Sequence, residues 1–474
     1  MTAALVRDGG CPRCAALKAR VVELEAQLAA ARKDSGNSSK PPSSDIVKPP
    51  KEPRGRRSKR RKQGGQPGHP RHERPPFSPD EIDAAWDYTL DACPDCGGEL
   101  DDADEPRADE PNNGAAPRVI QQVEIIARPI RVEEHRGRVY WCGACRKRHH
   151  APLPADVVKA GLVGPRLTAL VAYLKGPCHA SFSTIRRFLA DVVGVRISRG
   201  HLAKLVQKVS RGLSASYEEL LHALPGEPRL NVDETGHPDR GRRLWTWCFR
   251  SQLFTLYRID PSRGSDVLVD VLGEEFDGLL GCDYFSAYRK YMKDFDVRVQ
   301  FCLAHLIRDV KFLIKHPSRA NRRYGQTLLA HLRKLFGTIH RRDTFASAES
   351  FRRTLVAVRN RLVTDAIMQL PRTREAGNVA DRFANDFDSY FRFISEPDIA
   401  PTNNLAEQAI RFVAIHRRIT QGTRGAAGQR WCERMWTVVQ TCTQQGRSAF
   451  EFLAATVTAQ FQSTIPPSLL PDSS

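Results

Sequence analysis

The 474-residue sequence lacks the long apolar runs and local signatures that mark several large classes of protein. No run approaches the roughly 20 apolar residues that a membrane-spanning helix needs, and the N-terminus carries no apolar signal core. We therefore expect no membrane association and no export. No phosphate-binding loop, no GxSxG and no Cys–His constellation of a nucleophilic enzyme offers a competing chemistry.

Acidic residues are scarce relative to basic ones: 54 Asp and Glu stand against 73 Lys and Arg, a formal net charge of +19. This balance favours a polyanionic partner, because Lys and Arg release the counterions condensed on phosphates. The length predicts several domains, and the apolar fraction of 41% fits folded domains joined by polar linkers. In a reducing compartment, the twelve cysteines indicate metal ligands or buried thiols rather than disulfides.

Residues 1–34 contain a short heptad repeat. Apolar side chains recur at alternating spacings of four and three, at Leu17, Val21, Leu24, Leu28 and Ala31. The pattern predicts a short coiled coil and hence a homodimer or higher oligomer; the alternative is one amphipathic helix packed on its own chain. Cys11 and Cys14 form a lone CxxC. One such pair cannot complete a four-ligand zinc site, although two pairs across a dimer could, and we expect uncommitted thiols.

Residues 35–79 are rich in Pro, Ser, Lys and Arg and show no apolar period, so we expect a disordered basic linker. Its basic block should contact DNA phosphates without reading sequence; the alternative is a solvated tail. The arginines assigned to this contact are Arg56, Arg57, Arg60 and Arg61.

Two CxxC knuckles predict a zinc-ribbon DNA-binding domain over residues 80–155. The pairs Cys93/Cys96 and Cys142/Cys145 each lie in a Gly-containing turn and together supply four thiolates for one structural Zn²⁺. Strand-like runs occupy residues 119–132 and 138–142. Four unrelated buried cysteines are the alternative.

Residues 156–225 predict a helical, helix-turn-helix-like region. Helical periodicity over 162–174 precedes a helix capped by Ser181, a turn at Gly194, and a second helix over 199–209. This succession is typical of a DNA-reading motif. Two ordinary packed helices are the alternative.

Residues 226–315 predict the first part of an α/β core. Three short runs, 230–235, 244–250 and 253–259, predict an antiparallel meander whose first strand ends in a turn at 236–241. Further strands at 278–283 and 297–303 alternate with helices at 264–272 and 304–314. This is the order of a ribonuclease-H-like sheet, in which the first and fourth strands are neighbours. Asp233 and Asp283 would then project from adjacent strands.

The remaining chain is predicted to be helical. We expect an all-α insertion over 316–400 and C-terminal helices over 401–462 that carry a third acidic residue, Glu407. A flexible basic loop is expected at 422–428, and a disordered tail over 463–474.

Three carboxylates on separate elements, Asp233, Asp283 and Glu407, suit Mg²⁺ or Mn²⁺, which prefer oxygen ligands. Two such ions about 3.5–4 Å apart could activate the attacking oxygen and stabilise the leaving one in phosphodiester displacement. Each carboxylate has a structural alternative: the aspartates could cap their strand ends, and Glu407 could form a capping box with Asn404. Strand alternation sends Glu234 to the face opposite Asp233.

Several segments together resemble the transposases of IS66-type insertion sequences. They are residues 35–45, 64–69, the CxxC pairs, 232–235 (VDET), 282–288 (CDYFSAY) and 402–411 (TNNLAEQAIR). The resemblance implies a DDE nuclease on a ribonuclease-H-like fold, with Asp233, Asp283 and Glu407 as its triad. It also implies a role near the scissile phosphate for His305, which lies in the CxxH that begins at Cys302.

From this resemblance we expect a cytoplasmic bacterial transposase that binds terminal inverted repeats and target DNA, cuts the ends and transfers the strands. Small accessory proteins of the same element are implied partners. We assign a grip on the transposon end to arginines that follow the third carboxylate: Arg411, Arg417, Arg418 and Arg424. The alternatives are a sequence-specific DNA-binding protein or decayed transposase without nuclease activity, and a structure-directed nuclease of the same fold.

Overall fold

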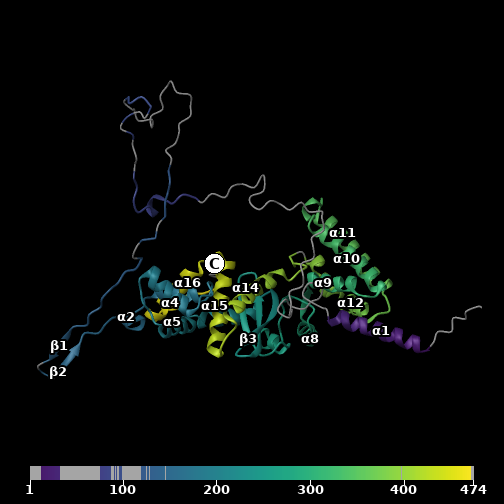
Figure 1. Ribbon diagram of the computed structural model, residues 1–474, viewed down its shortest axis with the longest axis horizontal. Coiled ribbons are helices and arrows are strands. Elements are labelled where there is room, and N and C mark those ends of the chain that lie inside the picture. Colours follow the sequence, from purple (N-terminus) through teal and green to yellow (C-terminus); the bar gives the residue numbers. More distant parts are fainter. Residues whose placement is uncertain are drawn as a thin grey trace, which may run out of the picture. The chain divides into compact units, whose positions relative to one another are not determined.

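The structure is a computed structural model of the chain, shown in Figure 1. It describes residues 12–31, 75–86, 90, 92, 95–98, 119–123, 125–126, 129–142, 144, 146–396 and 398–470. The chain forms two compact units, one of residues 1–50 and 133–474 and one of residues 51–132. In the smaller unit a 3₁₀ turn, η2 (Pro79–Glu81), follows Ser78. The backbone of Phe77 exchanges two hydrogen bonds with the side-chain amide of Gln121.

The predicted N-terminal helix is present as α1 (Pro12–Ala31). The apolar side chains of its heptad seam that the structure describes are exposed, from 47% at Leu24 to 59% at Leu17. An exposed seam is what a coiled coil requires before its partner helix binds. The dimer therefore stays a prediction, and Cys11 lies outside the described residues.

The expected zinc ribbon is represented by one antiparallel hairpin, β1 (Val139–Cys142) with β2 (Lys147–His150). The strand expected at 138–142 is confirmed. The one expected at 119–132 is wrong for the residues of that run that the structure describes, because none of them lies in a strand. Cys93, Cys145 and the side chain of Cys142 lie outside the described residues, and Cys96 is exposed. The zinc site stays a prediction.

The helical region contains the two capped helices that the sequence predicts. Ser181 Oγ accepts a hydrogen bond from Thr184 N at 3.0 Å, and Ser198 Oγ accepts one from His201 N at 3.2 Å. Gly194, with φ 80°, makes the turn between them. The elements are α2 (Ala155–Ala160), α3 (Pro165–Lys175), α4 (Phe182–Phe188), the π-helical turn η3 (Leu189–Val193), α5 (Arg199–Gly212), α6 (Ser214–Ala223) and η4 (Leu224–Gly226).

One segment, Ala155–Lys175, is long and apolar enough to cross a membrane by length and composition alone. The expectation that no run reaches this length is therefore wrong. The segment is divided into α2 and α3 by a turn that begins at Gly161, whose φ is 67°. Helix α3 packs against α5 and α16 (Ala449–Gln462).

A five-stranded mixed sheet forms the centre of the larger unit, in the order β5-β4-β3-β6-β7. Its strands are β3 (Arg229–Asp239), β4 (Arg242–Arg250), β5 (Thr255–Asp260), β6 (Leu279–Cys282) and β7 (Arg298–Phe301). The first three are antiparallel, whereas β6 runs parallel to both β3 and β7. The predicted neighbourhood of the first and fourth strands is confirmed.

Strand β3 is longer than predicted. The expected turn at 236–241 is wrong, because pairing with β4 continues to Asp239 opposite Arg242. The turn is reduced to Arg240 and Gly241, both with positive φ (48° and 79°). A two-residue turn of this kind keeps the two strands in register with their twist. The strand therefore extends well beyond Asp233.

Helices cover both faces of this sheet (Figure 1). Helices α14 (Asn404–Thr420) and α15 (Ala426–Gln444) pack on one face, where Tyr257 of β5 contacts the ring of Trp436. On the other face, Tyr288 of α8 (Ser286–Phe295) contacts Trp247 of β4. Helix α7 (Asp266–Leu272) packs against α8.

Helix α15 also seals the exposed edge of the sheet. Its residues Glu433, Thr437 and Thr441 accept hydrogen bonds from the backbone N–H groups of Ile259, Tyr257 and Thr255 at 2.7–3.1 Å. The acceptors are four residues apart along the helix and the donors two residues apart along the strand. Both spacings are about 6 Å, so each acceptor lies opposite a donor. Edge N–H groups that would otherwise pair with another chain are thereby satisfied.

The predicted helical insertion and C-terminal helices are present. After α9 (Leu303–Lys315) come α10 (Arg319–Ile339), η5 (Arg342–Thr344), α11 (Ala348–Met368), α12 (Arg374–Asn385) and α13 (Phe387–Ser395), followed by α14, α15 and α16. The disordered tail is wrong as far as Leu470. Leu469 is fully buried, and Ser468 Oγ donates to Glu219 of α6 at 2.7 Å.

Candidate active site

The ends of the parallel strands β3 and β6 bring two carboxylates to one level of the sheet. Asn231 pairs with Gly281, so Asp233 and Asp283 each lie two residues beyond a matched pair. A Cβ at Gly281 would lie 2.5 Å from Asn231 Nδ2, so a larger residue here would displace the Asn231 side chain. The sequence prediction that the two aspartates leave adjacent strands is confirmed in its strand order.

Asn403 joins helix α14 to this level of β3. Its side chain donates to Val232 O at 2.8 Å and accepts from Asn231 Nδ2 at 2.8 Å. Its backbone N–H points at Cys302 Sγ, 3.1 Å away. Because Asn403 is also the residue before α14, it sets where the first turn of that helix lies. A role for Asn403 was not predicted from the sequence, although the residue lies directly before a predicted helix.

Glu407 does not cap its helix. The residue at the N-cap position is Asn403, whose side chain makes no capping bond. The Glu407 carboxylate instead reaches α9, where Oε2 accepts from Arg308 Nη2 at 3.2 Å. The capping box with Asn404 is therefore wrong, and Glu407 faces the elements that follow β7.

His305 lies beside Glu407 and is held by the same arginine. Arg308 Nη1 lies 2.9 Å from His305 Nε2, and His305 Nδ1 lies 3.5 Å from Glu407 Oε1. Since an arginine can only donate, Nε2 must accept, and the proton of the neutral ring sits on Nδ1 facing Glu407. Burial, together with the Arg308 charge, lowers the His305 pKa to about 4, so the ring is neutral near pH 7.

Two buried polar atoms at this site have no hydrogen-bond partner among the described residues: His305 Nδ1 and Glu407 Oε1. Buried polar atoms are nearly always paired. An unpaired donor and an unpaired acceptor side by side therefore indicate a site that binds a ligand or an ion.

The carboxylates at the strand ends are strained electrostatically. Burial raises the pKa of Asp233 well above its usual range, and the charges of Glu234, Asp283 and Glu407 raise it further. Burial, together with Glu234, raises the pKa of Asp283 to about 7, against the opposing effects of the Phe285 N–H and Arg263. Like charges crowded at low solvent exposure are costly unless a cation joins them.

Glu234 lies on the opposite face of β3, as alternation predicts. It accepts two hydrogen bonds from Arg263, at 2.6 and 2.9 Å, and one from Tyr288 at 2.5 Å. The Arg263 guanidinium also lies over the ring of Phe285, 3.8 Å from its centroid. This charged support behind the aspartates had no clear sequence signal, because Arg263 lies in a loop 29 residues beyond Glu234.

A second ligand set overlaps the first. One ligand atom each from Cys302, His305 and Glu407 lies within 4.8 Å of the others. Burial raises the pKa of the Cys302 thiol to about 11, and the ring nitrogen that faces Glu407 carries its proton. A soft metal here would have to displace both protons, so we consider the three carboxylates the better candidate for a divalent ion.

The arginines assigned to DNA fall into three groups. Arg56, Arg57, Arg60 and Arg61 lie outside the described residues, whereas Arg411, Arg418 and Arg424 are exposed. Arg417 differs, because its Nη1 donates to Thr235 Oγ1 at 2.9 Å and also contacts Gly236 O. That side chain holds α14 against β3.

Comparison with known proteins gives a consistent family assignment. A model of the transposase IS66 family matches residues 160–430, more than half of the chain, and a family of unknown function matches residues 11–75. Two uncharacterized proteins of Sinorhizobium fredii, y4qI and y4hP, are 25% and 23% identical over 336 and 361 residues. These matches cover 64% and 68% of this chain, but only 61% and 64% of those relatives.

Proposed function

Because the chain belongs to the IS66 family of transposases, we propose that it cuts and joins DNA through a DDE site on a ribonuclease-H-like sheet. The triad is Asp233, Asp283 and Glu407. The observation that carries this proposal is the pair of aspartates that leave β3 and β6 at one level, beside a glutamate with an unpaired oxygen. The strand order, with the first and fourth strands adjacent, supports the fold assignment.

The residues at the site fit magnesium. Three crowded carboxylates whose like charges repel one another offer the oxygen donors that Mg²⁺ and Mn²⁺ prefer, and Glu407 Oε1 is free to bind an ion. Asp233, Asp283 and Glu407 would hold two ions. When bound, such ions polarise a phosphodiester and stabilise charge on its attacking and leaving oxygens.

The chain's own residues would orient this site. Arg308 holds Glu407 through Oε2, and it fixes the His305 tautomer by occupying Nε2. His305 Nδ1–H is thereby left as a neutral donor that can face a phosphate oxygen of the DNA. On the far face, Arg263 and Glu234 restrain the strand that bears Asp233.

Substrate recognition would combine several segments. We propose that the linker arginines contact phosphates, and that the helix-turn-helix-like region and a zinc ribbon bind the terminal inverted repeats. Two ends must be held together, for which a dimer through α1 is suited; small accessory proteins of the element are further proposed partners. Elemental analysis should find about one Zn per chain, lost on replacing Cys93 and Cys96 by Ser; zinc-free native protein would contradict the ribbon.

The test of function is a Mg²⁺-dependent cleavage assay on the element's own ends, with accessory proteins supplied. Wild type should cut and transfer strands, whereas Asp233→Asn and Glu407→Gln should bind the ends without cutting. If wild type binds the ends but cuts no more than these variants, the chain is a DNA-binding protein or a decayed transposase. Equal cutting of duplexes without the inverted repeats would instead indicate a structure-directed nuclease.

A further inference from the structure

The tip of the β3–β4 hairpin is a basic turn of unusual composition. Arg240 and Gly241 form the two-residue turn, and both have positive φ. The first position of such a turn usually holds Asn, Asp or Gly, because a larger side chain there is strained by roughly 1 kcal/mol. Arg240, Arg242 and Arg243 are all exposed. Because Arg240 occupies a strained backbone position, we consider its guanidinium a candidate for ligand binding.

A loop far along the chain is fastened to this hairpin. Asp239 Oδ1 accepts hydrogen bonds from Thr423 Oγ1 at 2.8 Å and from Gly425 N at 2.7 Å. Thr423 N donates to Pro238 O at 3.0 Å. The prediction of a flexible loop at 422–428 is therefore wrong, because this network binds the loop to the end of β3. We call these hydrogen bonds, from Thr423 and Gly425 to Pro238 and Asp239, the clasp.

Glycines make the close approach of this loop possible. A Cβ at Gly422 would lie 2.1 Å from Pro238 O, and Gly422 has φ 86°. At Gly425 a Cβ would lie 3.9 Å from the Arg240 guanidinium, which places that guanidinium beside the loop. The clasp thus brings the exposed Arg424 to the hairpin tip.

The arginines around the clasp have no carboxylate of their own. In the part of the chain that the structure describes, none of them forms an ion pair, and the nearby Asp239 carboxylate is occupied by Thr423 and Gly425. We name the following set the hairpin surface: Arg240, Arg242, Arg243 and Arg424. Arg243 lies over the ring of Trp245, 4.5 Å from its centroid, so its position is partly fixed.

We propose that the hairpin surface grips the phosphate backbone of duplex DNA at a fixed distance from the candidate active site. Six residues of β3 separate Asp233 from Asp239, which is about 20 Å at ~3.3 Å per residue. Duplex DNA rises about 3.4 Å per base pair. A duplex that follows β3 therefore meets the hairpin surface about six base pairs from the reacting phosphate.

Phosphate contact, rather than base reading, suits this surface. Arginines without acidic partners gain by releasing counterions, and each neutralised phosphate adds about 0.9 to the slope of log affinity against log salt. The grip should therefore act on terminal and unrelated duplexes alike. This inference rests on the proposed function in assuming a DNA substrate.

The test compares binding by the full chain and by Arg240→Asn/Arg242→Gln, since Asn tolerates positive φ. The probe is a 60-base-pair duplex containing the element's end, titrated at several salt concentrations. We expect the salt slope to fall by roughly 2, and hydroxyl-radical protection to disappear about six base pairs from the cut site. Arg352→Gln/Arg353→Gln on the exposed side of α11 controls for the loss of two charges and should leave that protection intact.

A second variant tests the clasp without removing charge. Gly422→Ala should displace the loop from Pro238 and weaken the same protection. The purified variant should still unfold in one cooperative thermal transition, which shows that the chain is folded. An unchanged slope and unchanged protection in both variants would overturn the proposal. Asp233→Asn separates the two ideas, because it should lose cleavage and keep the protection. If wild type binds the duplex without cleaving it, the proposed nuclease activity is contradicted. The phosphate contact of the hairpin surface is then still decided by the salt slope of the variants.

Discussion

Two glutamates on neighbouring helices of the same sheet, one buried and one half-buried, have opposite surroundings. Glu433 of α15 has both oxygens satisfied, by Ile259 N at 2.7 Å and by Arg430 at 2.9 Å. Glu407 of α14 has one oxygen on Arg308 at 3.2 Å and the other without a hydrogen bond among the described residues. The first belongs to the sealed edge of β5, and the second to the ends of β3 and β6.

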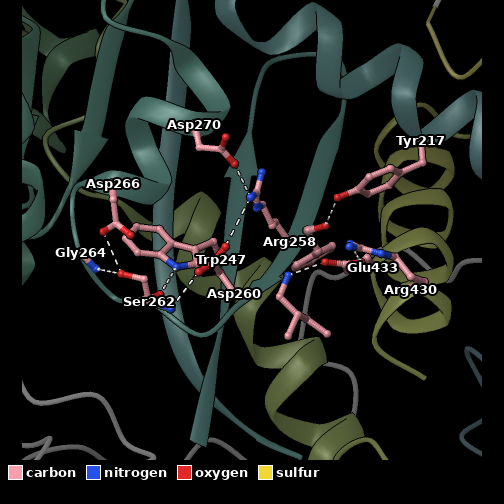
Figure 2. A network of polar contacts seen from close by, with 12 residues as sticks. Tyr217, Trp247, Arg258, Asp260, Ser262, Gly264, Asp266, Asp270, Arg430 and Glu433 are labelled. Carbon is pink, nitrogen blue, oxygen red and sulfur yellow. Dashed lines mark hydrogen bonds and ion pairs between the residues drawn. The ribbon is translucent and has the colours of Figure 1, made fainter. Parts of the chain in front are cut away.

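Figure 2 shows how complete the edge network is. Arg258 is placed between Asp260 and Asp270, and Tyr217 Oη donates to Tyr257 O at 3.0 Å. Charges there are matched by opposite charges. At the strand ends, by contrast, Asp233 and Asp283 lie among further carboxylates that raise their pKa. Removing one partner of a matched buried pair destabilises a fold, whereas crowded like charges are tolerated where a ligand restores the balance.

The largest expected effect of this contrast is on catalysis. Asp233→Asn should reduce Mg²⁺-dependent cleavage by about 10³-fold or more, roughly 4 kcal/mol, because it removes a metal ligand. It should not lower the melting temperature, because it also removes a repelling charge. Strand cleavage and thermal melting on the same preparation check both parts. Cleavage close to that of wild type would remove Asp233 from the site.

The next effect concerns pH. The Asp283 pKa is raised from 3.8 to about 7, so between these values the folded chain binds more protons than the unfolded chain. Stability of the metal-free protein should therefore fall as pH rises from about 4 to 7, by roughly 2–4 kcal/mol from this group. Denaturant unfolding in EDTA should show the fall reduced in Asp283→Asn. The variant serves as its own control for the buried histidines, whose lowered pKa values act in the opposite direction. Parallel curves for the two proteins would contradict the prediction.

At the sealed edge the expected effect is on stability alone. Glu433→Ala leaves the buried Ile259 N–H without its acceptor and should cost about 1–3 kcal/mol of unfolding free energy. Cleavage per folded molecule should be unchanged. Arg166→Ala is the control, because both side chains of the Arg166–Glu451 ion pair are exposed (65% and 56%), so losing the pair should change stability little. Loss of cleavage by folded Glu433→Ala would break the comparison.

The smallest effect is expected at Arg308. Arg308→Met should weaken Mn²⁺ binding by roughly fivefold, about 1 kcal/mol, because Glu407 loses the bond that orients it. Arg308→Lys should restore part of that affinity by contacting Glu407, but it cannot bridge His305 and Glu407 together. Electron paramagnetic resonance of free Mn²⁺ measures this without DNA. Tighter binding by the Met variant would show that Arg308 competes with the ion instead of orienting its ligand.

Much of the sheet could be predicted because its signals are local. Alternating apolar residues in β3 and β4 and the nearly all-apolar β6 specify strands, and the order of elements specifies that β3 and β6 are adjacent. The end of β3 was missed because Gly236 and Pro238 are common turn residues. They are accommodated here because the strand pairs with β4 and is held by Thr423 across 186 residues of sequence.

The candidate site was predictable in its acidic residues and not in their supports. Asp233, Asp283 and Glu407 follow or begin apolar elements, which is a signal along the chain. Asn403, Arg308 and Arg263 act through contacts with residues far away in sequence or through helix packing, and single polar residues in those places carry no periodic signal. The tail through Leu470 was wrongly predicted to be disordered because it is rich in proline. Its order depends on Leu469, whose backbone bonds to Glu219 of α6 and to Gln445 at the end of α15.

The most direct measurement is anomalous X-ray diffraction from crystals of the chain, with a terminal duplex, soaked in Mn²⁺. We expect two peaks with oxygens of Asp233, Asp283 and Glu407 at about 2.1 Å, and neither peak in Asp233→Asn. A peak on Cys302 and His305 alone, or none within reach of the two aspartates, would contradict it.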